Sequence, residues 1–339
     1  MDGDEQQHGG MTFDDHNRPS SDAAPSSEQA PEPAREIAPD VAPNVPPEVS
    51  SQAPPQVTLQ VAPAPSAPNF DARFAAAYLR PPNPLLPEDL RVPWGWPDLV
   101  LLVIVALFGT LILSTFLAQG FALSGISLKQ LRNGGSENNL FLIINQALLS
   151  LILLAYLALQ MRLRFRAPFW RSIGWRRLQT GALPRAAAYL GLILSGFLLA
   201  VLVSVSSSAF NTKTTMPIEH FFQDRRSALL LMSLGVLLAP VLEETIFRGY
   251  IYPVVARSFG VNAGILLTGT LFGLLHASQL WGGWAQIALL VVVGIVFTYA
   301  RARTHTVVTS YLLHVSYNSS LFLAFIVASH GFRYFPGAH

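Results

Sequence analysis

The sequence predicts an all-α fold, a polytopic transmembrane helical bundle of about seven spans preceded by a disordered N-terminal tail. Of the 339 residues, 51% are apolar and only 12% are charged, which is unlike an ordinary soluble domain. Several apolar runs are about 20 residues long, enough to cross the hydrocarbon layer as a helix. The chain contains no cysteine, which excludes disulfides, thiolate nucleophiles and cysteine-ligated zinc.

Residues 1–94 form a distinct acidic segment. They hold 14 of the 20 acidic residues and 18 of the 25 prolines but only five arginines, so their net charge is −9. A segment so rich in Pro, Ala and Ser is predicted to remain disordered. Phe70, Phe74 and Tyr78 recur every fourth residue, which indicates a short interfacial helix over 70–80. We expect no cleaved signal peptide, because no apolar run follows the acidic start.

After Trp94, long apolar runs alternate with short polar segments. All six tryptophans lie at the ends of these runs or between them, as expected for side chains that favour the headgroup layer. We divide this part of the chain into N-terminal helices over 95–210 and a C-terminal core over 225–330. The seven predicted spans cover residues 97–120, 139–160, 186–208, 227–257, 262–280, 284–302 and 307–329.

The distribution of Lys and Arg predicts the orientation. With the tail on the cytoplasmic side, the inner segments carry 14 of these residues and the outer segments six. The positive-inside rule therefore predicts an integral, multi-pass protein in the lipid bilayer with a cytoplasmic N-terminus and an external C-terminus. The overall charge of +2 averages the acidic tail with a basic membrane part, so it gives no reason to expect a nucleic-acid partner.

Two adjacent glutamates, Glu243 and Glu244, lie about midway along the fourth apolar run. A charge at bilayer depth costs about 2.5–3.5 kcal/mol on insertion scales, so the pair needs a partner, a proton or a water-filled cavity. Glu244 has an i,i+4 partner in Arg248, and a purely structural salt bridge is the alternative interpretation of that pair. Glu243 points about 100° away and is left free for chemistry. Pro240 is expected to kink the helix and make room for water.

The other four acidic residues after Trp94 differ from this pair. They fall at predicted membrane interfaces, where water reaches them, and are Asp98, Glu137, Glu219 and Asp224.

Of the eight histidines, only His276 and His314 lie inside apolar runs. A single buried histidine is usually a core residue, but position favours a functional interpretation here. Glu243 and His276 are equally far from the turn at Phe259 and Gly260, so helices folded back there bring them to one depth, about 24 Å from the turn. The same count places His314 about 12 Å nearer the cytoplasm, an offset that tilt or a kink must absorb.

Two further spacings involve these histidines. Asn318 follows His314 at i,i+4, and His276 follows Phe272 in the same way, so each pair shares a helix face. Gly269 and Gly273 form a small-xxx-small pattern that would let the fifth helix approach a neighbour closely.

The motifs Glu-Glu-x-x-x-Arg at 243–248, Phe-x-x-x-His at 272–276 and His-x-x-x-Asn at 314–318 follow one another on successive predicted membrane helices. In this combination the chain resembles the CAAX prenyl protease and bacteriocin-processing (CPBP, also Abi) family over about 225–325. The resemblance implies an endopeptidase that hydrolyses a peptide bond inside the membrane, in a membrane-associated or lipidated peptide or protein substrate.

The resemblance also implies roles for individual residues. Glu243 would activate water, and His276 would help to hold the water or a metal. His314 and Asn318 would stabilise the oxyanion or complete the site. The supporting residues would be Glu244, Arg248 and Phe272.

A divalent metal such as zinc stays open as a cofactor. Glu243, His276 and His314 could supply three ligands, with water in the fourth position. However, no H-E-x-x-H helix is present, and a glutamate that ligates a metal is less able to act as a base. We therefore favour a glutamate-dependent, metal-free reaction.

Two other functions fit intramembrane Glu, His and Arg. One is a proton-coupled transporter, although the polar groups cluster in the last four helices and no internal repeat is evident. The other is a non-catalytic membrane scaffold or immunity protein that keeps the polar cluster for stability.

Overall fold

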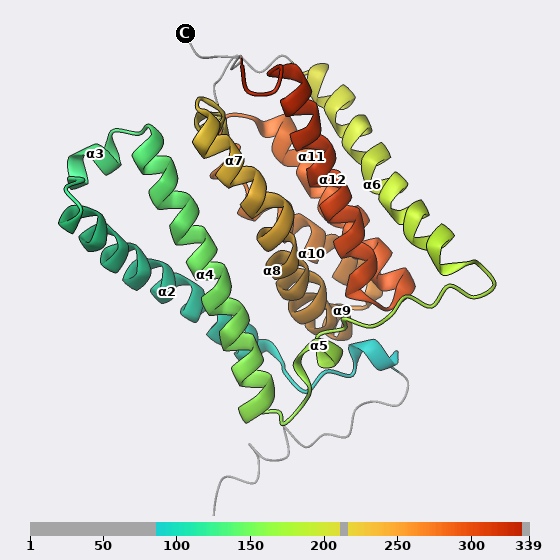
Figure 1. Ribbon diagram of the computed structural model, residues 1–339. Helices are drawn as coiled ribbons and strands as arrows, with labels where there is room; N and C mark the ends of the chain where they lie inside the picture. Colours follow the sequence, from blue (N-terminus) through green and yellow to red (C-terminus); the bar gives the residue numbers. More distant parts are fainter. Residues whose placement is uncertain (1–85, 211–215, 334–339) are drawn as a thin grey trace, which may run out of the picture. The chain divides into compact units, whose positions relative to one another are not determined.

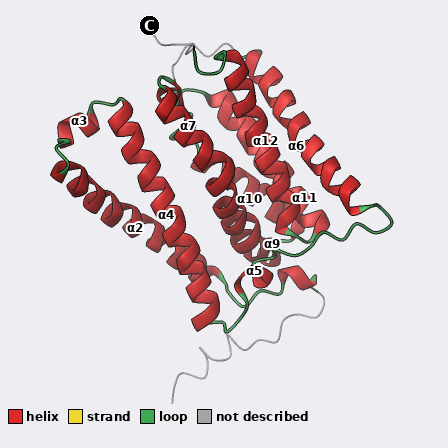
Figure 2. Cartoon of the chain, in the orientation of Figure 1, coloured by secondary structure: helices red, strands yellow, loops and turns green. Residues whose placement is uncertain are grey.

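The computed structural model describes residues 86–210 and 216–333. Every regular element in these two ranges is a helix, which confirms the all-α fold (Figure 2). Six helical stretches are long and apolar enough to cross a membrane, which confirms an integral, multi-pass protein. They are α2 (Trp96–Leu123), α4 (Ser136–Leu163), α6 (Arg185–Ser208), the continuous stretch Arg225–Phe259, α11 (Trp284–Thr304) and α12 (Val307–Ala328).

The long helices pack as neighbours around a C-terminal core. The α2–α4 hairpin lies on one side of that core and α6 on the other (Figure 1). Helix α4 contacts the stretch Arg225–Phe259, and α12 packs against both α6 and α11. Short helices join these elements, namely η1 (Glu88–Leu90), α3 (Leu128–Arg132), α5 (Phe169–Ser172) and η2 (Pro217–Phe222).

The stretch Arg225–Phe259 changes its hydrogen-bond pattern along its length. It runs through α7 (Arg225–Ser233), the π-helical η3 (Leu234–Leu238), α8 (Ala239–Glu244), the π-helical η4 (Thr245–Ile251) and α9 (Tyr252–Phe259). The disturbance expected at Pro240 thus takes the form of a π-helical segment directly before it. Two such segments flank the short helix α8, which carries Glu243 and Glu244, and π-bulges occur frequently at functional sites.

The fifth span, predicted over 262–280, is wrong in its extent. Helix α10 covers only Val261–Leu275, which is too short to cross the membrane alone, and residues 276–283 form turns. The helix ends here because His276 caps it. The backbone N–H of His276 bonds to the carbonyl of Gly273 (3.2 Å), and its ring Nδ1 bonds to the carbonyl of Phe272 (2.8 Å), so two terminal carbonyls are satisfied without a further turn.

Glycines set the distance between α10 and α11. A Cβ atom at Gly269 would lie 2.5 Å from the backbone nitrogen of Ile295, and one at Gly273 would lie 2.5 Å from Cγ2 of Val291. Both distances are too short for a side chain. The close approach expected from the small-xxx-small pattern is therefore confirmed.

The packed part of the chain begins before Trp94, earlier than the predicted end of the tail. Leu90 and Trp94 are 2% and 1% exposed. The Trp94 ring stacks on Tyr250 with centroids 5.0 Å apart, and its Nε1 donates to the Tyr250 carbonyl at 2.9 Å. Aromatic burial holds this segment against the bundle. The interfacial helix predicted at 70–80 lies outside the described residues, as does the tail up to residue 85.

Asp98, expected at a membrane interface in contact with water, is fully buried. Its Oδ1 lies 2.8 Å from Nη1 of Arg164 and accepts from Nε2 of Gln160 at 3.2 Å. Its Oδ2 accepts from the backbone N–H of Gly95 at 2.9 Å. A buried charge of this kind needs such partners, and here they tie the start of α2 to the end of α4.

Candidate active site

Glu243, His276 and His314 come together from three helices. Nε2 of His276, at the end of α10, lies 4.0 Å from Oε1 of Glu243 on α8. Nε2 of His314, on α12, lies 3.7 Å from Oε2 of the same carboxylate. The chain folds back at Gly260, as the equal spacing predicted. His314 also lies close to the Glu243 carboxylate, although counting residues from the turns placed it nearer the cytoplasm.

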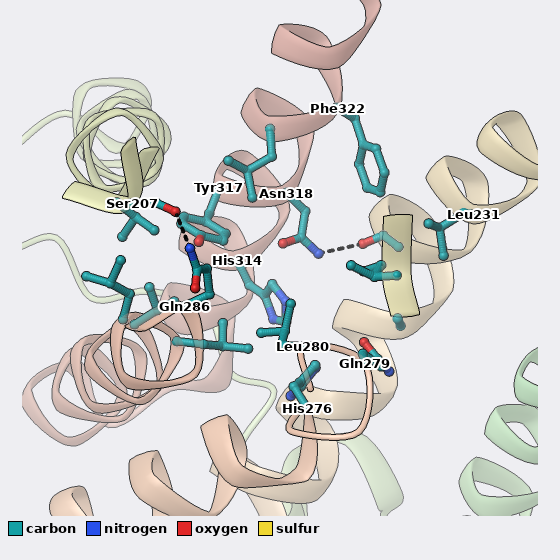
Figure 3. Close-up of a pocket in the computed structure, with 18 of the residues that line it drawn as sticks. Ser207, Leu231, His276, Gln279, Leu280, Gln286, His314, Tyr317, Asn318 and Phe322 are labelled. Carbon is teal, nitrogen blue, oxygen red and sulfur yellow. Dashed lines mark hydrogen bonds between the residues drawn. The ribbon is translucent and has the colours of Figure 1, made fainter. Parts of the chain in front are cut away.

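These three groups line a cavity of about 750 Å³. The Glu243 and His276 side chains are each 21% exposed, so the cavity reaches them. Figure 3 shows His276, His314 and Asn318 directed toward the same space. Most of the other lining residues are apolar and come from α6, α7, α11 and α12, among them Val203, Leu231, Leu289, Leu290, Val293, Leu321, Phe322 and Phe325.

Glu244 and Arg248 lie behind this wall, and both are completely buried. Nη1 of Arg248 is 2.9 Å from Oε1 of Glu244, Nη2 donates to the carbonyl of Gly294 at 2.9 Å, and Nε donates to Oγ1 of Thr298 at 3.3 Å. The expected i,i+4 ion pair is therefore formed. No sequence motif identified Gly294 and Thr298, although their own i,i+4 spacing on α11 was a usable signal.

Phe272 separates the buried cation from both imidazoles. Its ring centre lies 4.4 Å from Cζ of Arg248, 4.8 Å from the His276 ring and 5.7 Å from the His314 ring. Phe297 of α11, which no sequence motif identified, packs 5.1 Å from the His314 ring. Aromatic faces favour a cation at such distances, so these rings stabilise Arg248 and restrict both histidines.

The hydrogen bonds assign the ring protons. The Phe272 carbonyl can only accept, so the Nδ1 of His276 that faces it carries a proton, and the Nε2 of the neutral ring presents a lone pair toward Glu243. His314 lies between the two carboxylates, with Nδ1 2.9 Å from Oε1 of Glu244 and Nε2 facing Glu243. Both ring nitrogens of His314 therefore face a carboxylate oxygen.

The three metal-ligand candidates do not form a ligand set. In residues 86–210 and 216–333, no group of three or more His, Asp or Glu side chains is arranged to hold a metal ion. His276 and His314 face different oxygens of Glu243, and Nδ1 of His314 is already bonded to Glu244. The bond from Nδ1 of His314 to Glu244 does not itself exclude a metal, because a metal-ligating histidine usually donates from its other ring nitrogen to a carboxylate.

Asn318 lies on the cavity wall on the same face of α12 as His314, as expected from their spacing. Its Nδ2 donates to the backbone carbonyl of Gly235 at 2.7 Å, the bond drawn between α12 and η3 in Figure 3. One of its two amide N–H groups is therefore used in a contact between helices.

Fold and site together define a polytopic membrane protein in which an acidic group and two imidazoles face an intramembrane cavity. Residues 225–320 match the family model described as Type II CAAX prenyl endopeptidase Rce1-like. The match covers all seven expected site residues and confirms the resemblance to the CPBP family. It supports an intramembrane endopeptidase of the CAAX type as the general class, with a peptide substrate in the membrane. No curated protein and no solved structure matches the chain.

Proposed function

We propose that this protein is an intramembrane endopeptidase in which Glu243 activates the water that hydrolyses the peptide bond. The observation that carries this proposal is a carboxylate on the wall of a cavity of about 750 Å³, with the Nε2 atoms of His276 and His314 at 4.0 and 3.7 Å. Glu243 forms no direct ion pair with Arg248, which is bonded to Glu244 instead. It is therefore available as a base.

The separation of Glu243 and His276 suits a bridging water. Polar atoms 4.0 Å apart are too far for a direct hydrogen bond, but a water about 2.8 Å from each can connect them. Glu243 accepts one of its protons, and the lone pair on Nε2 of His276 accepts the other hydrogen in a bond. The oxygen lone pair of the water is then directed into the cavity.

Hydrolysis follows in two steps. In the first, the water oxygen bonds to the carbonyl carbon, its proton passes to Glu243, and the carbonyl electrons move to the oxygen as an oxyanion. In the second, the carbonyl re-forms, the C–N bond breaks, and Glu243 returns the proton to the leaving nitrogen. General base catalysis of this kind contributes about 10²–10⁴-fold in rate.

His314 is the group that stabilises the negative charge that develops on the carbonyl oxygen. When it is protonated, Nδ1–H donates to Glu244 and Nε2–H is directed toward Glu243 and the cavity. A donor held at an oxyanion in a site with little water is worth several kcal/mol. Glu244 and Arg248 support this role, because the carboxylate behind the ring orients it and is itself held by the guanidinium. Asn318 lies on the cavity wall on the same face of α12 as His314.

The substrate class follows from the cavity lining and the matched family. Leucine, valine and phenylalanine side chains dominate the wall, and such a wall accommodates an apolar or lipidated segment without desolvating charges. We propose a membrane-associated or lipidated peptide or protein as the substrate.

The test compares the membrane proteomes of cells that express the wild type or Glu243→Gln. The expected result is a set of cleavage products that form only with the wild type. Unchanged cleavage with Glu243→Gln would refute the glutamate mechanism. Solute uptake into vesicles that depends on Glu243, without cleavage, would favour a transporter instead.

A further inference from the structure

The contact between Asn318 and Gly235 involves the helix that carries the proposed base. Gly235 lies in the π-helical segment η3, and α8 with Glu243 follows directly. The Nδ2···O distance of 2.7 Å is that of a short, well-formed hydrogen bond. The carbonyl of a helical residue is normally occupied by a backbone N–H, so its availability to a side chain needs an explanation.

Pro240 explains why the Gly235 carbonyl has no backbone N–H as its partner. The N–H of Ala239, which would bond to Gly235 in an α-helix, bonds instead to the carbonyl of Leu234, five residues earlier. The next donor in this π pattern belongs to residue 240, which is proline and has no N–H. A polar group that loses its hydrogen-bond partner in an apolar environment destabilises the folded protein. The Asn318 amide thus supplies the donor that the backbone lacks.

Gly235 also allows α12 to come close. A Cβ atom at this position would lie 3.0 Å from Cε2 of Phe322, a tighter contact than side chains normally make. Phe322 follows Asn318 at i,i+4, so both reach η3 from one face of α12. The absence of a side chain at Gly235 therefore lets the amide approach the carbonyl.

We propose that Asn318 is a positioning residue that acts through Glu243, by replacing the N–H that Pro240 lacks as the donor to the Gly235 carbonyl. The bond fixes the beginning of the short helix α8, and Glu243 lies three residues after Pro240 on that helix. The effect on activity rests on the proposed function of Glu243. The effect on stability does not.

A double-mutant cycle between positions 240 and 318 tests this role in the purified full-length protein. Pro240→Ala restores a backbone N–H, so that the carbonyls of the turn can be satisfied without Asn318. We expect Asn318→Ala alone to lower the melting temperature and to lower kcat on the order of 100-fold, with little change in KM, because the base is displaced. In the Pro240→Ala background we expect the same substitution to cost less than about tenfold in kcat and little in melting temperature.

Equal costs of Asn318→Ala in the two backgrounds, in either kcat or melting temperature, would overturn the proposal. A direct oxyanion donor would give equal kcat costs, because restoring the backbone bond does not replace it. If the wild type cleaves no substrate, the proposed function fails, but the melting temperatures still decide whether Asn318 substitutes for the missing N–H.

A second variant covers the case in which Asn318→Ala does not fold. Asn318→Asp keeps the size of the side chain, but its ionised carboxylate repels the Gly235 carbonyl and its protonated form can donate to it. We expect the melting temperature and kcat of this variant, relative to the wild type at the same pH, to recover as the pH falls. A relative activity and stability that do not change with pH would contradict the proposal.

Discussion

His314 donates from Nδ1 to Oε1 of Glu244 at 2.9 Å, the same oxygen that pairs with Nη1 of Arg248. One carboxylate therefore orients the imidazole at the cavity and neutralises the buried guanidinium. The two adjacent glutamates consequently differ: Glu244 has two strong partners, whereas no side chain in the described part of the chain lies within direct hydrogen-bond distance of Glu243.

This difference predicts that Glu243→Gln abolishes activity without unfolding the protein. We expect kcat to fall by at least about 100-fold, because the base is removed, while the melting temperature stays close to that of the wild type. Cleavage assays and thermal unfolding in detergent measure the two quantities. Glu137→Gln is the matched control, since Glu137 lies in the first turn of α4 and does not line the cavity.

Glu244→Gln should have the opposite profile, with a large loss of stability. Removing one partner of a buried ion pair costs about 3–5 kcal/mol, because the remaining charge is left uncompensated. Both Arg248 and His314 lose their partner here. We expect the melting temperature to fall well below that of Glu243→Gln, measured side by side. Equal melting temperatures for the two variants would refute the assignment of Glu244 as the buried anchor.

The ion pairs of Asp89 predict that the folded protein becomes less stable in acid. Burial raises the pKa of this carboxyl, but Arg301 at 2.7 Å and His305 at 2.9 Å outweigh burial and hold the pKa below its usual value. The contribution of ionised Asp89 to the free energy of unfolding is therefore fully present above the unfolded-state pKa of about 4. This contribution is lost as the pH falls through the lower folded-state pKa.

Thermal unfolding between pH 6 and pH 3 measures this effect. We expect Asp89→Asn to melt at a lower temperature than the wild type at pH 6, and the gap to narrow as the pH falls. A gap that is constant with pH would show that the ionised carboxylate does not carry the stabilisation.

The contact between α10 and α11 predicts that Gly273→Ala is destabilising. Its Cβ would lie 2.5 Å from Val291, and overpacking of this kind costs about 1–3 kcal/mol. Gly191→Ala on α6 is the control, because a Cβ there meets nothing within 4 Å and alanine favours the helix by about 0.5–1 kcal/mol. Melting temperatures that shift in the same direction for both variants would contradict the role of the glycine contact.

The arrangement of donors predicts that chelators leave the activity intact. Because residues 86–210 and 216–333 contain no group of three or more His, Asp or Glu side chains placed to hold a metal ion, we expect peptide cleavage to continue in EDTA or 1,10-phenanthroline. Loss of activity that added zinc restores would show that a metal takes part. The glutamate mechanism would then need revision.

Most of the membrane helices and several site residues could be predicted from the sequence, because the bilayer imposes simple rules. A helix needs about 20 apolar residues to cross the hydrocarbon, so all seven predicted spans fall on helices of the structure, and six of these helices are long enough to cross a membrane. The high cost of buried charge singled out Glu243 and Glu244. The i,i+4 spacing then identified Arg248 as the ion-pair partner, and equal distances from the turn at Gly260 placed His276 opposite Glu243.

The tertiary structure decided what local rules do not contain. The sequence did not show that α10 stops at His276, because that end depends on a histidine that bonds to the Phe272 carbonyl. The depth of His314 could not be obtained by counting from turns, since the packing of α12 against α8 sets it. Hydropathy and spacing report on one helix at a time, whereas contacts such as that of Asn318 with Gly235 form only when two helices pack.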